Sequence, residues 1–368
     1  MVEWKKLGEI SDIGTGSNNR EDACDNGKYP FYVRSKDVLK INSYLYDEEA
    51  ILIPGEGGIG EIFHYVNGKY GLHQRTYRVH PVSREVAGRY LYYYLFENFG
   101  AYIEQKSYKS TAASIRKPML ISFPVALPSL SEQQRIVGIL DTFTASIDNL
   151  KELIAQRRKQ YEYYRCCLFS NEQWTENKIG ELTKVFSCPR VFKDQWQDSG
   201  VPFWRSSDIM SYHNGVINPR GEAYISQSLY EELSSKSDKI KEGDILVTGG
   251  GSIGIPYLKK DNSPLFVKDA DLICIHKCTS IIPKYLYHYF LSTDFKLYIK
   301  KITHDATIAH YTINQIKDTP IPLPPLPEQH RIVSILDTFE SSITNLESQL
   351  AQREKQYEYY RNKLLTFE

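Results

Sequence analysis

The sequence of 368 residues lacks the features that mark membrane and secreted proteins. No apolar run approaches the roughly 20 residues that a membrane span needs. The first ten residues, MVEWKKLGEI, contain no apolar segment typical of a signal peptide. The six cysteines show no even spacing, which favours free thiols in a reducing compartment over a disulfide framework. The sequence therefore predicts a cytoplasmic protein.

An excess of charge of either sign is missing as well. The chain has Lys+Arg 45 and Asp+Glu 45, so no global basic field indicates a nucleic-acid partner. A chain long enough for two or three domains can still carry local basic faces that are balanced by acidic ones elsewhere. The net charge therefore neither supports nor excludes nucleic-acid binding.

Motifs for nucleotide binding and for catalysis are also missing. DIGTG at 12–16 and TGGGSIG at 248–254 are rich in glycine. Neither fits G-x-G-x-x-G at the start of a helix after a strand, nor G-x-x-x-x-G-K-[ST], so we interpret them as tight turns that let the backbone approach a partner. The sequence has no Asn/Asp-Pro-Pro-aromatic tetrad, with which amino-methyltransferases hold a flipped base. We therefore predict no catalytic centre and no cofactor.

The segment CIHKC at 274–278 combines two thiols with an imidazole. On a strand, Cys274, His276 and Cys278 would share one face, and these groups are ligands that zinc prefers. No second cluster of ligands follows in the sequence. We therefore favour a structural strand over a metal site.

The chain does contain a long internal repeat. KQYEYYR stands at 159–165 and again at 355–361, and the match extends without a gap over 130–168 and 326–364. Fainter matches lie upstream, for example ILIPGEGGIG at 51–60 with ILVTGGGSIG at 245–254. The organisation is a variable domain followed by a near-constant segment, twice. We expect domains at 1–128 and 171–324, and helices at 129–170 and 325–368.

The near-constant segments are predicted to be long helices that form a coiled coil. Their apolar residues follow a 4-3 spacing over about four heptads, and a sustained period of 3.5 residues is the seam of a coiled coil. Arg157 and Arg353 lie in this seam as charged residues that fix the register at a cost in stability. The alternative for KQYEYYR is a solvated helix end with two aromatic core positions. The seam comprises Leu140, Phe143, Ile147, Leu150, Ile154, Arg157, Tyr161, Tyr164, Leu336, Phe339, Ile343, Leu346, Leu350, Arg353, Tyr357 and Tyr360.

The variable segments are predicted to be small α/β domains. EAILIPG and GDILVTG are short apolar strands that end in glycine turns, and RYLYYYLFENFGAYIEQ and KYLYHYFLSTDFKLYIKK have the spacing of aromatic helices. The fold class is therefore α+β, with two α/β domains separated by two long antiparallel helices. Antiparallel packing converts the direct repeat into a pseudo-two-fold. A two-fold arrangement with a fixed separation suits B-DNA, whose half-sites recur along the duplex.

The chain resembles the specificity (S) subunit of type I restriction–modification systems. The residues that carry the resemblance are LPSLSEQQRIVGILD and LPPLPEQHRIVSILD, together with WKKLGEI at 4–10 and a GGxIG turn, and the resemblance covers essentially the whole chain. It implies two target-recognition domains, each for one half of a bipartite double-stranded DNA site. It also implies that the chain is a non-catalytic subunit that binds two modification (methyltransferase) subunits, to which restriction (helicase–nuclease) subunits can be added.

Residues in loops, rather than in the repeated helices, are expected to contact the DNA. Base edges are recognised by hydrogen-bonding side chains, and phosphates by Lys, Arg or small hydroxyl donors. Taken alone, a single Arg or Lys of this kind is more often a solvated surface charge than a DNA contact, but equivalent positions in both halves favour the group. The candidates are Arg34, Ser35, Lys36, His73, Gln74, Arg75, Tyr108, Lys109, Ser110 and Thr111 in the first domain, and Arg205, Ser206, Ser207, Lys268, Thr303, His304 and Thr307 in the second.

These loops differ greatly between the two domains, which predicts two different half-sites rather than a palindrome. Two other functions stay open at this stage. A two-domain scaffold whose coiled coil binds only protein would explain the heptads, the tyrosines and the zero net charge. A fusion of a methyltransferase with a recognition domain is disfavoured by the missing catalytic tetrad.

Overall fold

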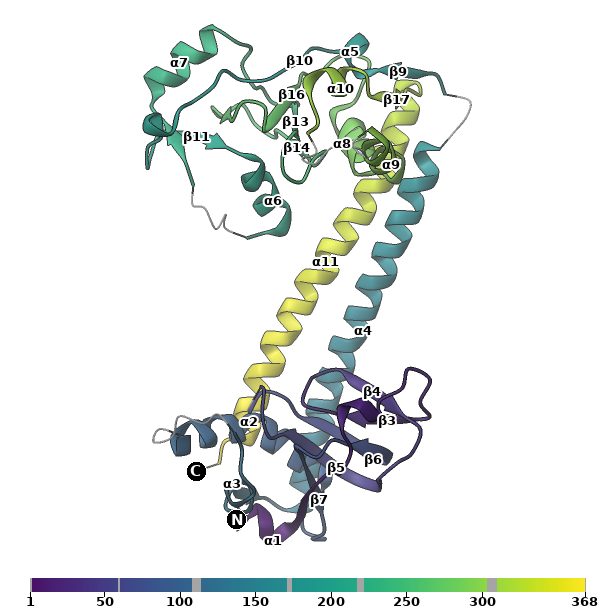
Figure 1. Cartoon of the computed structure of the whole chain (residues 1–368), viewed down its shortest axis with the longest axis vertical. Helices are drawn as coiled ribbons and strands as arrows, with labels where there is room; N and C mark the ends of the chain where they lie inside the picture. The colour runs from purple at the N-terminus through teal and green to yellow at the C-terminus, as the bar shows by residue number, and fades with distance from the viewer. Residues whose placement is uncertain are drawn as a thin grey trace. The chain divides into compact units, whose positions relative to one another are not determined.

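The computed structural model describes residues 2–58, 60–107, 114–170, 174–216, 222–302 and 310–367. The chain divides into two compact units, one made of Met1–Glu152 and Glu347–Glu368 and the other of Leu153–Leu346. The division falls inside both long helices, α4 (Leu130–Phe169) and α11 (Leu326–Leu365), so each unit contains part of both (Figure 1). The predicted α+β fold class and the two long helices are confirmed. Within the described ranges, no helix is long and apolar enough to cross a membrane.

The first unit is built on a six-stranded sheet with the order β2-β7-β5-β6-β3-β4. Neighbouring strands are antiparallel, except that β3 and β6 are parallel. A separate antiparallel pair joins β1 (Glu3–Lys6) to β8 (Pro124–Leu127). The sheet strands are β2 (Ser11–Thr15), β3 (Tyr29–Tyr32), β4 (Val38–Ile41), β5 (Tyr46–Pro54), β6 (His64–Leu72) and β7 (Thr76–Pro81). The shorter helical elements are α1 (Leu7–Ile10), η1 (Arg20–Asp22) and α3 (Lys117–Ile121).

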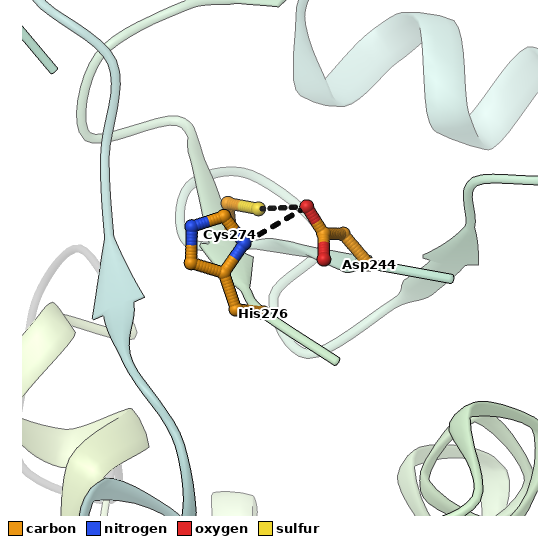
Figure 2. Close-up of side chains that lie close together, drawn as sticks. All are labelled: Asp244, Cys274 and His276. Atoms are coloured by element: carbon orange, nitrogen blue, oxygen red, sulfur yellow. Dashed lines mark hydrogen bonds and ion pairs between the residues drawn. The ribbon is translucent and has the colours of Figure 1, made fainter. Parts of the chain in front are cut away.

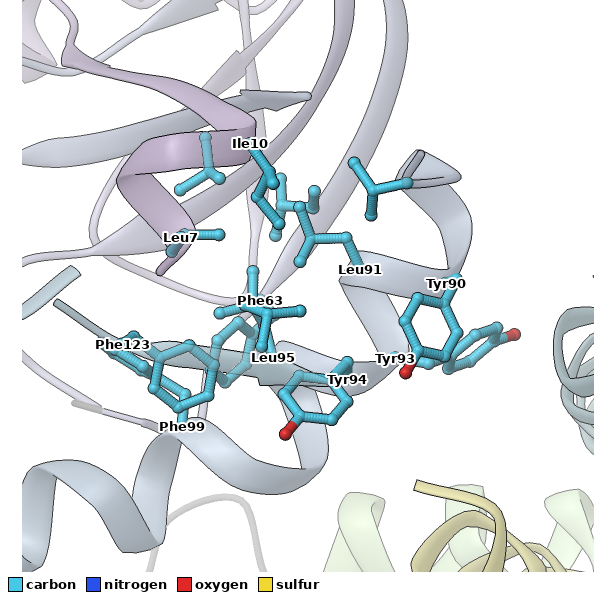
Figure 3. Packing of buried hydrophobic residues seen from close by; sticks show 14 of the residues in the cluster. Leu7, Ile10, Phe63, Tyr90, Leu91, Tyr93, Tyr94, Leu95, Phe99 and Phe123 are labelled. Carbon is cyan, nitrogen blue, oxygen red and sulfur yellow. The ribbon is translucent and has the colours of Figure 1, made fainter. Parts of the chain in front are cut away.

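The core of the first unit forms around α2 (Gly88–Ser107) (Figure 3). Its aromatic and aliphatic residues recur at helical spacing, so one side of the helix is apolar, and Tyr90, Tyr93 and Leu95 are fully buried. A buried hydroxyl needs a partner, and Tyr90 donates its hydroxyl hydrogen to the Ala126 carbonyl at 2.7 Å. The helix is therefore held to β8 by a directed bond as well as by burial.

Residues near 365 complete this first unit. Leu365 is buried in the same core cluster as Leu140, and Tyr357 packs against that cluster. Asn98 donates to the Leu365 carbonyl at 3.3 Å, and Arg361 forms an ion pair with Glu97 on α2. The last turns of α11 are thus an integral part of the unit that begins with β1.

The second unit has shorter strands in three sheets, with the orders β10-β16-β13-β14, β12-β11-β15 and β17-β9. All pairs are antiparallel except β11 with β15, which repeats the parallel pairing of β3 with β6. The strands are β9 (Glu176–Lys178), β10 (Val185–Phe186), β11 (Val201–Trp204), β12 (Tyr224–Ile225), β13 (Ile245–Thr248), β14 (Pro256–Leu258), β15 (Phe266–Val267), β16 (Leu272–Ile275) and β17 (Pro320–Pro322). The helices are α5 (Ile179–Leu182), η2 (Lys193–Gln195), α6 (Ser206–Asn214), α7 (Gln227–Ser235), α8 (Pro283–Leu291), α9 (Thr293–Ile302) and α10 (Ile313–Lys317).

The aromatic segment of the second unit is two helices, whereas the sequence predicts one. The fully buried Tyr285 on α8 donates to the Pro322 carbonyl at 2.7 Å, as Tyr90 does to Ala126. Ser292 then has an extended backbone and ends α8. Its hydroxyl accepts a hydrogen bond from the Phe295 N–H at 3.2 Å, which is the geometry of an N-cap for α9. A capping serine thus divides the expected helix.

The two long helices pack antiparallel through aromatic pairs. In the first unit, Phe143 on α4 stacks on Tyr360 on α11 with ring centroids 5.4 Å apart. In the second unit the roles are exchanged, because Phe339 on α11 contacts Tyr164 on α4 at 5.2 Å. Phe143 and Phe339 are repeat equivalents, and so are Tyr164 and Tyr360. This exchange is what an antiparallel arrangement of two near-identical segments produces.

The predicted seam residues differ in how deeply they lie between the helices. Leu140, Ile147, Ile154 and Leu336 are buried. The remaining members are half-buried, namely Phe143, Leu150, Arg157, Tyr161, Phe339, Ile343, Leu346, Leu350, Arg353 and Tyr357, while Tyr164 and Tyr360 are largely exposed. The Arg157 guanidinium lies 5.7 Å from the Phe339 ring centroid and that of Arg353 5.6 Å from Phe143, within the range of a cation–π contact.

Candidate nucleic-acid interface

In both units a glycine-rich turn follows the central strand and is held by the same backbone hydrogen bonds. After β5, the Gly55 N–H donates to the Arg75 carbonyl at 2.9 Å, and the Gly55 carbonyl accepts from the Ile115 N–H at 2.9 Å. After β13, the Gly249 N–H donates to Asp271 at 2.7 Å, and the Gly249 carbonyl accepts from Tyr311 at 2.8 Å. The two turns therefore have one backbone frame.

The parallel strand pairs place distant loops beside these turns. The His73 N–H, just beyond β6, donates to the Tyr32 carbonyl at the end of β3 at 3.0 Å. The equivalent bond in the second unit runs from the Lys268 N–H to the Trp204 carbonyl at 2.9 Å. Because the carboxyl ends of parallel strands meet at one edge of a sheet, the segments after β3 and β6 are neighbours, and so are those after β11 and β15. The candidate residues from separate stretches of sequence are thereby brought together.

In the first unit the candidates surround the Glu56 carboxylate. Arg34 and Arg75 donate to the same carboxylate oxygen at 3.1 and 2.9 Å. The Arg75 hydrogen bond, together with the charges of both arginines, lowers the pKa of Glu56. An open pocket of about 260 Å³ lies here, lined by Arg20, Val33, Arg34, Ser35, Glu56, Gly57 and His73. These arginines are held by a single exposed acid, and such pairs exchange readily for another anion because exposed ion pairs contribute little.

His73 lies beneath this pocket and is almost fully buried. Its Nδ1 accepts a hydrogen bond from the Arg75 N–H at 3.0 Å. Burial and then the neighbouring Arg34 and Arg75 charges lower the pKa of the imidazole. His73 thus stays neutral at neutral pH and shapes the loop that presents Arg75.

The second unit has a larger open pocket, of about 1000 Å³, in the equivalent place. It is lined by Lys193, Trp196, Arg205, Ser206, Ser207, Met210, Ser211, Gly250, Gly251, Ser252, Lys268, Asp271 and His310. The half-buried Lys268 forms an ion pair with Asp271 at 2.7 Å, and the Ser206 hydroxyl donates to the Asp271 carbonyl at 2.8 Å. Lys268 lines the second pocket and pairs with one acid, as Arg34 does in the first pocket.

Arg205 is the N-cap residue of α6, and its side chain pairs with an acid in the first turn of that helix. Its side chain is buried and forms two hydrogen bonds with Asp208, at 2.9 and 3.2 Å, while Asp208 also accepts from the Arg205 N–H at 2.7 Å. The guanidinium lies over the Trp196 ring, 5.5 Å from its centroid. Arg205 thereby fixes the wall of the pocket.

The other sequence candidates lie around the same two places. Ser35 donates its hydroxyl hydrogen to the Asp37 carbonyl at 3.1 Å, and Gln74 donates to Asn19 at 2.7 Å. Lys36 is exposed on the same loop as Ser35, and Ser207 lines the second pocket. The candidates Tyr108, Lys109, Ser110, Thr111, Thr303, His304 and Thr307 lie outside the described residues.

Sequence reasoning missed several residues of these pockets. Glu56 and Gly250 stand within the glycine-rich turns, so the turns themselves were a signal for them. Arg20, Lys193 and Trp196 come from stretches without any motif, and only the fold brings them to the pocket. No pattern in the sequence indicates that these three lie near the turns.

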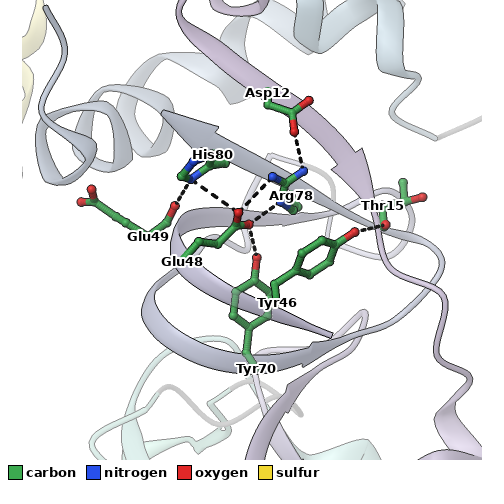
Figure 4. Close-up of polar contacts among 8 residues, drawn as sticks. All are labelled: Asp12, Thr15, Tyr46, Glu48, Glu49, Tyr70, Arg78 and His80. Atoms are coloured by element: carbon green, nitrogen blue, oxygen red, sulfur yellow. Dashed lines mark hydrogen bonds and ion pairs between the residues drawn. The ribbon is translucent and has the colours of Figure 1, made fainter. Parts of the chain in front are cut away.

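A second ionic cluster of the first unit lies within its sheet (Figure 4). Arg78 on β7 forms ion pairs with Glu48 and, at 2.9 Å, with Asp12, and the Tyr70 hydroxyl donates to Glu48 at 2.9 Å. Burial alone would raise the pKa of Glu48, but the hydrogen bonds from Arg78 and Tyr70 outweigh it and lower that pKa. His80 contacts the Glu49 carbonyl at 2.7 Å. The charges of this cluster are satisfied within it, which indicates a structural role.

Comparisons with known proteins agree with this architecture. A family model described as type I restriction modification DNA specificity domain matches residues 1–156 and 171–354. The chain is 32% identical over 385 residues to a putative type I restriction enzyme specificity subunit of Haemophilus influenzae, covering 100% of this chain and 96% of that protein. It is 28% identical over 390 residues to the EcoDI specificity subunit of Escherichia coli, covering 94% of this chain and 84% of that subunit.

Solved structures show the same fold. The S subunit of a type I restriction–modification system from M. genitalium aligns with a TM-score of 0.64 at 15% identity, covering 100% of this chain and 97% of that one. At that identity the likeness concerns the fold alone, while the family match rests on the sequence over both units. The chain therefore belongs to the family of type I restriction–modification DNA specificity proteins.

Proposed function

We propose that the chain is the DNA-recognition subunit of a type I restriction–modification complex and that each unit recognises one half of a bipartite, asymmetric target. The observation that carries this proposal is the shared backbone frame at Gly55 and Gly249, on which the two units display different side chains. One pocket presents arginines balanced by Glu56, and the other presents Lys268 balanced by Asp271.

The turns are suited to close contact with a duplex. Gly57 and Gly251 have φ angles of 71° and 73°, a conformation that glycine adopts without strain. The backbone can thus approach a phosphate or a base edge without a side chain between them. Because base pairs differ in their pattern of donors and acceptors, different side chains on one frame recognise different half-sites.

We further propose that the near-constant segments bind two methyltransferase subunits and that the chain has no catalytic role itself. The repeat places the same exposed residues on both helices, including Tyr163 and Tyr359, which are 66% and 59% exposed. Exposed tyrosines are typical of protein interfaces. Two equivalent surfaces support two copies of one partner, and restriction subunits can join such an assembly.

The decisive experiment measures DNA binding by the chain together with its methyltransferase partner. Fluorescence anisotropy compares a target duplex with duplexes in which one half-site is scrambled. Arg34→Ala and Arg75→Ala are expected to weaken binding and each to reduce the slope of log K against log salt by up to about one. Arg84→Ala is the matched control, because this exposed arginine follows the other end of β7; its binding should equal that of the unmodified chain.

Lys268→Ala should weaken binding in the same way, and its effect should add to that of Arg75→Ala because the two residues belong to different units. Absence of any salt-sensitive, sequence-dependent binding to DNA would contradict DNA recognition and favour a scaffold that binds only protein. Two palindromic duplexes, each made from one half-site twice, serve as a further comparison. If they bound as tightly as the asymmetric target duplex, the proposed asymmetric target would be contradicted.

A further inference from the structure

Three metal-ligating side chains meet at one end of the β13–β16 pair in the second unit (Figure 2). Asp244 precedes β13, Cys274 lies in β16, and His276 follows it. The Asp244 Oδ2 atom is 3.0 Å from His276 Nδ1 and 3.9 Å from Cys274 Sγ. The three ligand atoms all lie within 4.8 Å of one another.

The distances from the Asp244 oxygen to the other two ligand atoms suit a zinc ion. Zinc binds thiolate at about 2.3 Å and imidazole nitrogen or carboxylate oxygen at about 2.0–2.2 Å, so ligand atoms around one tetrahedral ion lie roughly 3–4 Å apart. Asp244 and Cys274 are buried, and the side chain of His276 is 18% exposed. The cluster is thus enclosed by protein and accessible to solvent on the side of the imidazole.

The Asp244 carboxylate is also held in place by the backbone. One oxygen accepts from the Lys241 N–H at 2.8 Å and the other from the Lys277 N–H at 3.0 Å. Hydrogen bonds of this kind orient the ligands of a metal site. The Phe186 ring lies against the His276 ring, with centroids 4.6 Å apart, and limits its rotation.

We propose that Asp244, Cys274 and His276 bind a zinc ion whose fourth position faces solvent beside His276. Without metal the three side chains are held together by hydrogen bonds to Asp244. Burial and then the Asp244 charge raise the pKa of the Cys274 thiol, so zinc has to displace a proton from the sulfur. The site is independent of the proposed DNA recognition.

The position in the first unit that corresponds to Cys274 holds a charged residue instead of a metal ligand. The strand register pairs Ile245 with Ile275 in the second unit and Ile51 with Val79 in the first. Cys274 therefore corresponds to Arg78, the centre of the ionic cluster with Glu48 and Asp12. One unit joins its two strands through charged pairs, and the other has metal ligands in that place.

The cluster and the second pocket lie at opposite ends of the same strand pair, so bound zinc would also affect the pocket. At the opposite end of the β13–β16 pair, Thr248 pairs with Leu272, and the next bond joins the Gly249 N–H to the Asp271 carbonyl. These are the strands that carry the glycine-rich turn and Asp271 of the second pocket. Zinc would fix one end of the ladder whose other end frames that pocket.

The test is metal binding by the full chain after treatment with a chelator. Zn²⁺ is titrated in competition with a chromogenic chelator, and Co²⁺ is used as a spectroscopic probe of thiolate ligation. We expect one equivalent of Zn²⁺ and a sulfur-to-cobalt absorption band. Cys274→Ser should abolish the band and weaken Zn²⁺ binding by more than about 100-fold, since even outer-shell changes cost 10- to 100-fold. Cys278→Ser is the matched control, a neighbouring thiol outside the cluster, and should retain both.

A measurement on the unmodified chain keeps the proposal testable should Cys274→Ser fail to fold. X-ray absorption of the zinc-loaded chain should show one sulfur ligand, with nitrogen and oxygen atoms as the others. Zn²⁺ should also raise the melting temperature of the unmodified chain and of Cys278→Ser, but not that of Asp244→Asn. Absence of stoichiometric binding, a shell without sulfur or with two sulfurs, or a band that persists in Cys274→Ser would each overturn the proposal.

Discussion

Gln133 and Gln329 make the same three hydrogen bonds, each within its own unit. The amide oxygen of Gln133 accepts from the Ala87 N–H at 2.9 Å, and that of Gln329 accepts from the Ile282 N–H at 2.9 Å. The amide nitrogens donate to the carbonyls of Glu85 and Pro128 in one unit and of Ser280 and Pro324 in the other. Both glutamines are fully buried. The glutamine of the repeated Glu-Gln signature thus joins each long helix to the segment that leads into the aromatic helix of its unit.

Replacing either glutamine by leucine should destabilise its unit. The change removes the partner of one backbone N–H and of two backbone carbonyls, of which that of Pro128 or Pro324 is buried, so we expect a loss of about 2–4 kcal/mol in the free energy of unfolding. Urea denaturation followed by circular dichroism measures this loss. Gln134→Leu and His330→Leu, at exposed neighbouring positions, are the controls. Similar midpoints for Gln133→Leu and Gln134→Leu would show that the hydrogen bonds contribute nothing.

The Arg78–Glu48 pair should make the stability of the first unit depend on pH. Because the pKa of Glu48 is lowered from its ordinary value of 4.5, the pair stabilises the folded state above that value. The contribution is lost as the pH falls through the lowered pKa, when the folded carboxylate becomes protonated. We expect the unfolding midpoint to fall steadily from about pH 5 downwards, measured by urea denaturation at each pH.

Arg78→Met removes this dependence and tests the assignment. At neutral pH the variant should be less stable by about 2–4 kcal/mol, because the Glu48 carboxylate loses its charged partner. The stabilities of the variant and the unmodified chain should converge as the pH falls from the ordinary value of 4.5 through the lowered pKa of Glu48. Parallel stability curves across the whole pH range would show that another group causes the acid sensitivity.

The buried leucines of the long helices should contribute far more than exposed ones. Leu140 and Leu336 are fully buried within the cores of their units, and their change to alanine should cost about 2–5 kcal/mol each. Leu153 on α4 is 40% exposed, so Leu153→Ala should cost less than about 1 kcal/mol. Equal losses for Leu140→Ala and Leu153→Ala would contradict the assigned seam.

The glycine-rich turn offers a test that separates binding from backbone strain. Gly251 and Gly215 have φ angles of 73° and 63°, and a Cβ atom on either would meet nothing within 4 Å. Gly251→Ala and Gly215→Ala should therefore destabilise the chain by similar amounts, about 1–2 kcal/mol. Gly251 lines the second pocket, so only Gly251→Ala should weaken DNA binding in an anisotropy titration. Equal affinities of the two variants would place the contact elsewhere.

The long helices could be predicted from the sequence because their signal is local. The 4-3 spacing from Leu140 to Tyr164 needs no knowledge of the rest of the chain, and the second copy repeats it. The break at Ser292 was missed because the apolar residues on both sides of this serine keep a helical spacing, so the pattern predicts one continuous helix. Only the extended backbone there reveals the cap.

The pockets could be predicted only in part, because they depend on pairing between distant strands. Arg34 and Arg75 were chosen separately, and the parallel alignment of β3 with β6 brings them to one carboxylate. Asp244 lies 30 residues before Cys274, so the sequence showed only two of the three clustered ligands. The pairing of Arg205 with Asp208 had a local signal, since an acid three residues after the N-cap is typical of a helix start.

The first unit combines two segments that are far apart in the sequence, and this has a consequence for folding during translation. Residues 347–368 reach the ribosome's exit roughly 200 residues after Glu152, which at about 5–20 residues per second takes roughly 10–40 seconds. Until then the core around Leu140 lacks Leu365, and Glu97 lacks Arg361. The first unit can therefore be completed only by residues that are translated well after the rest of it.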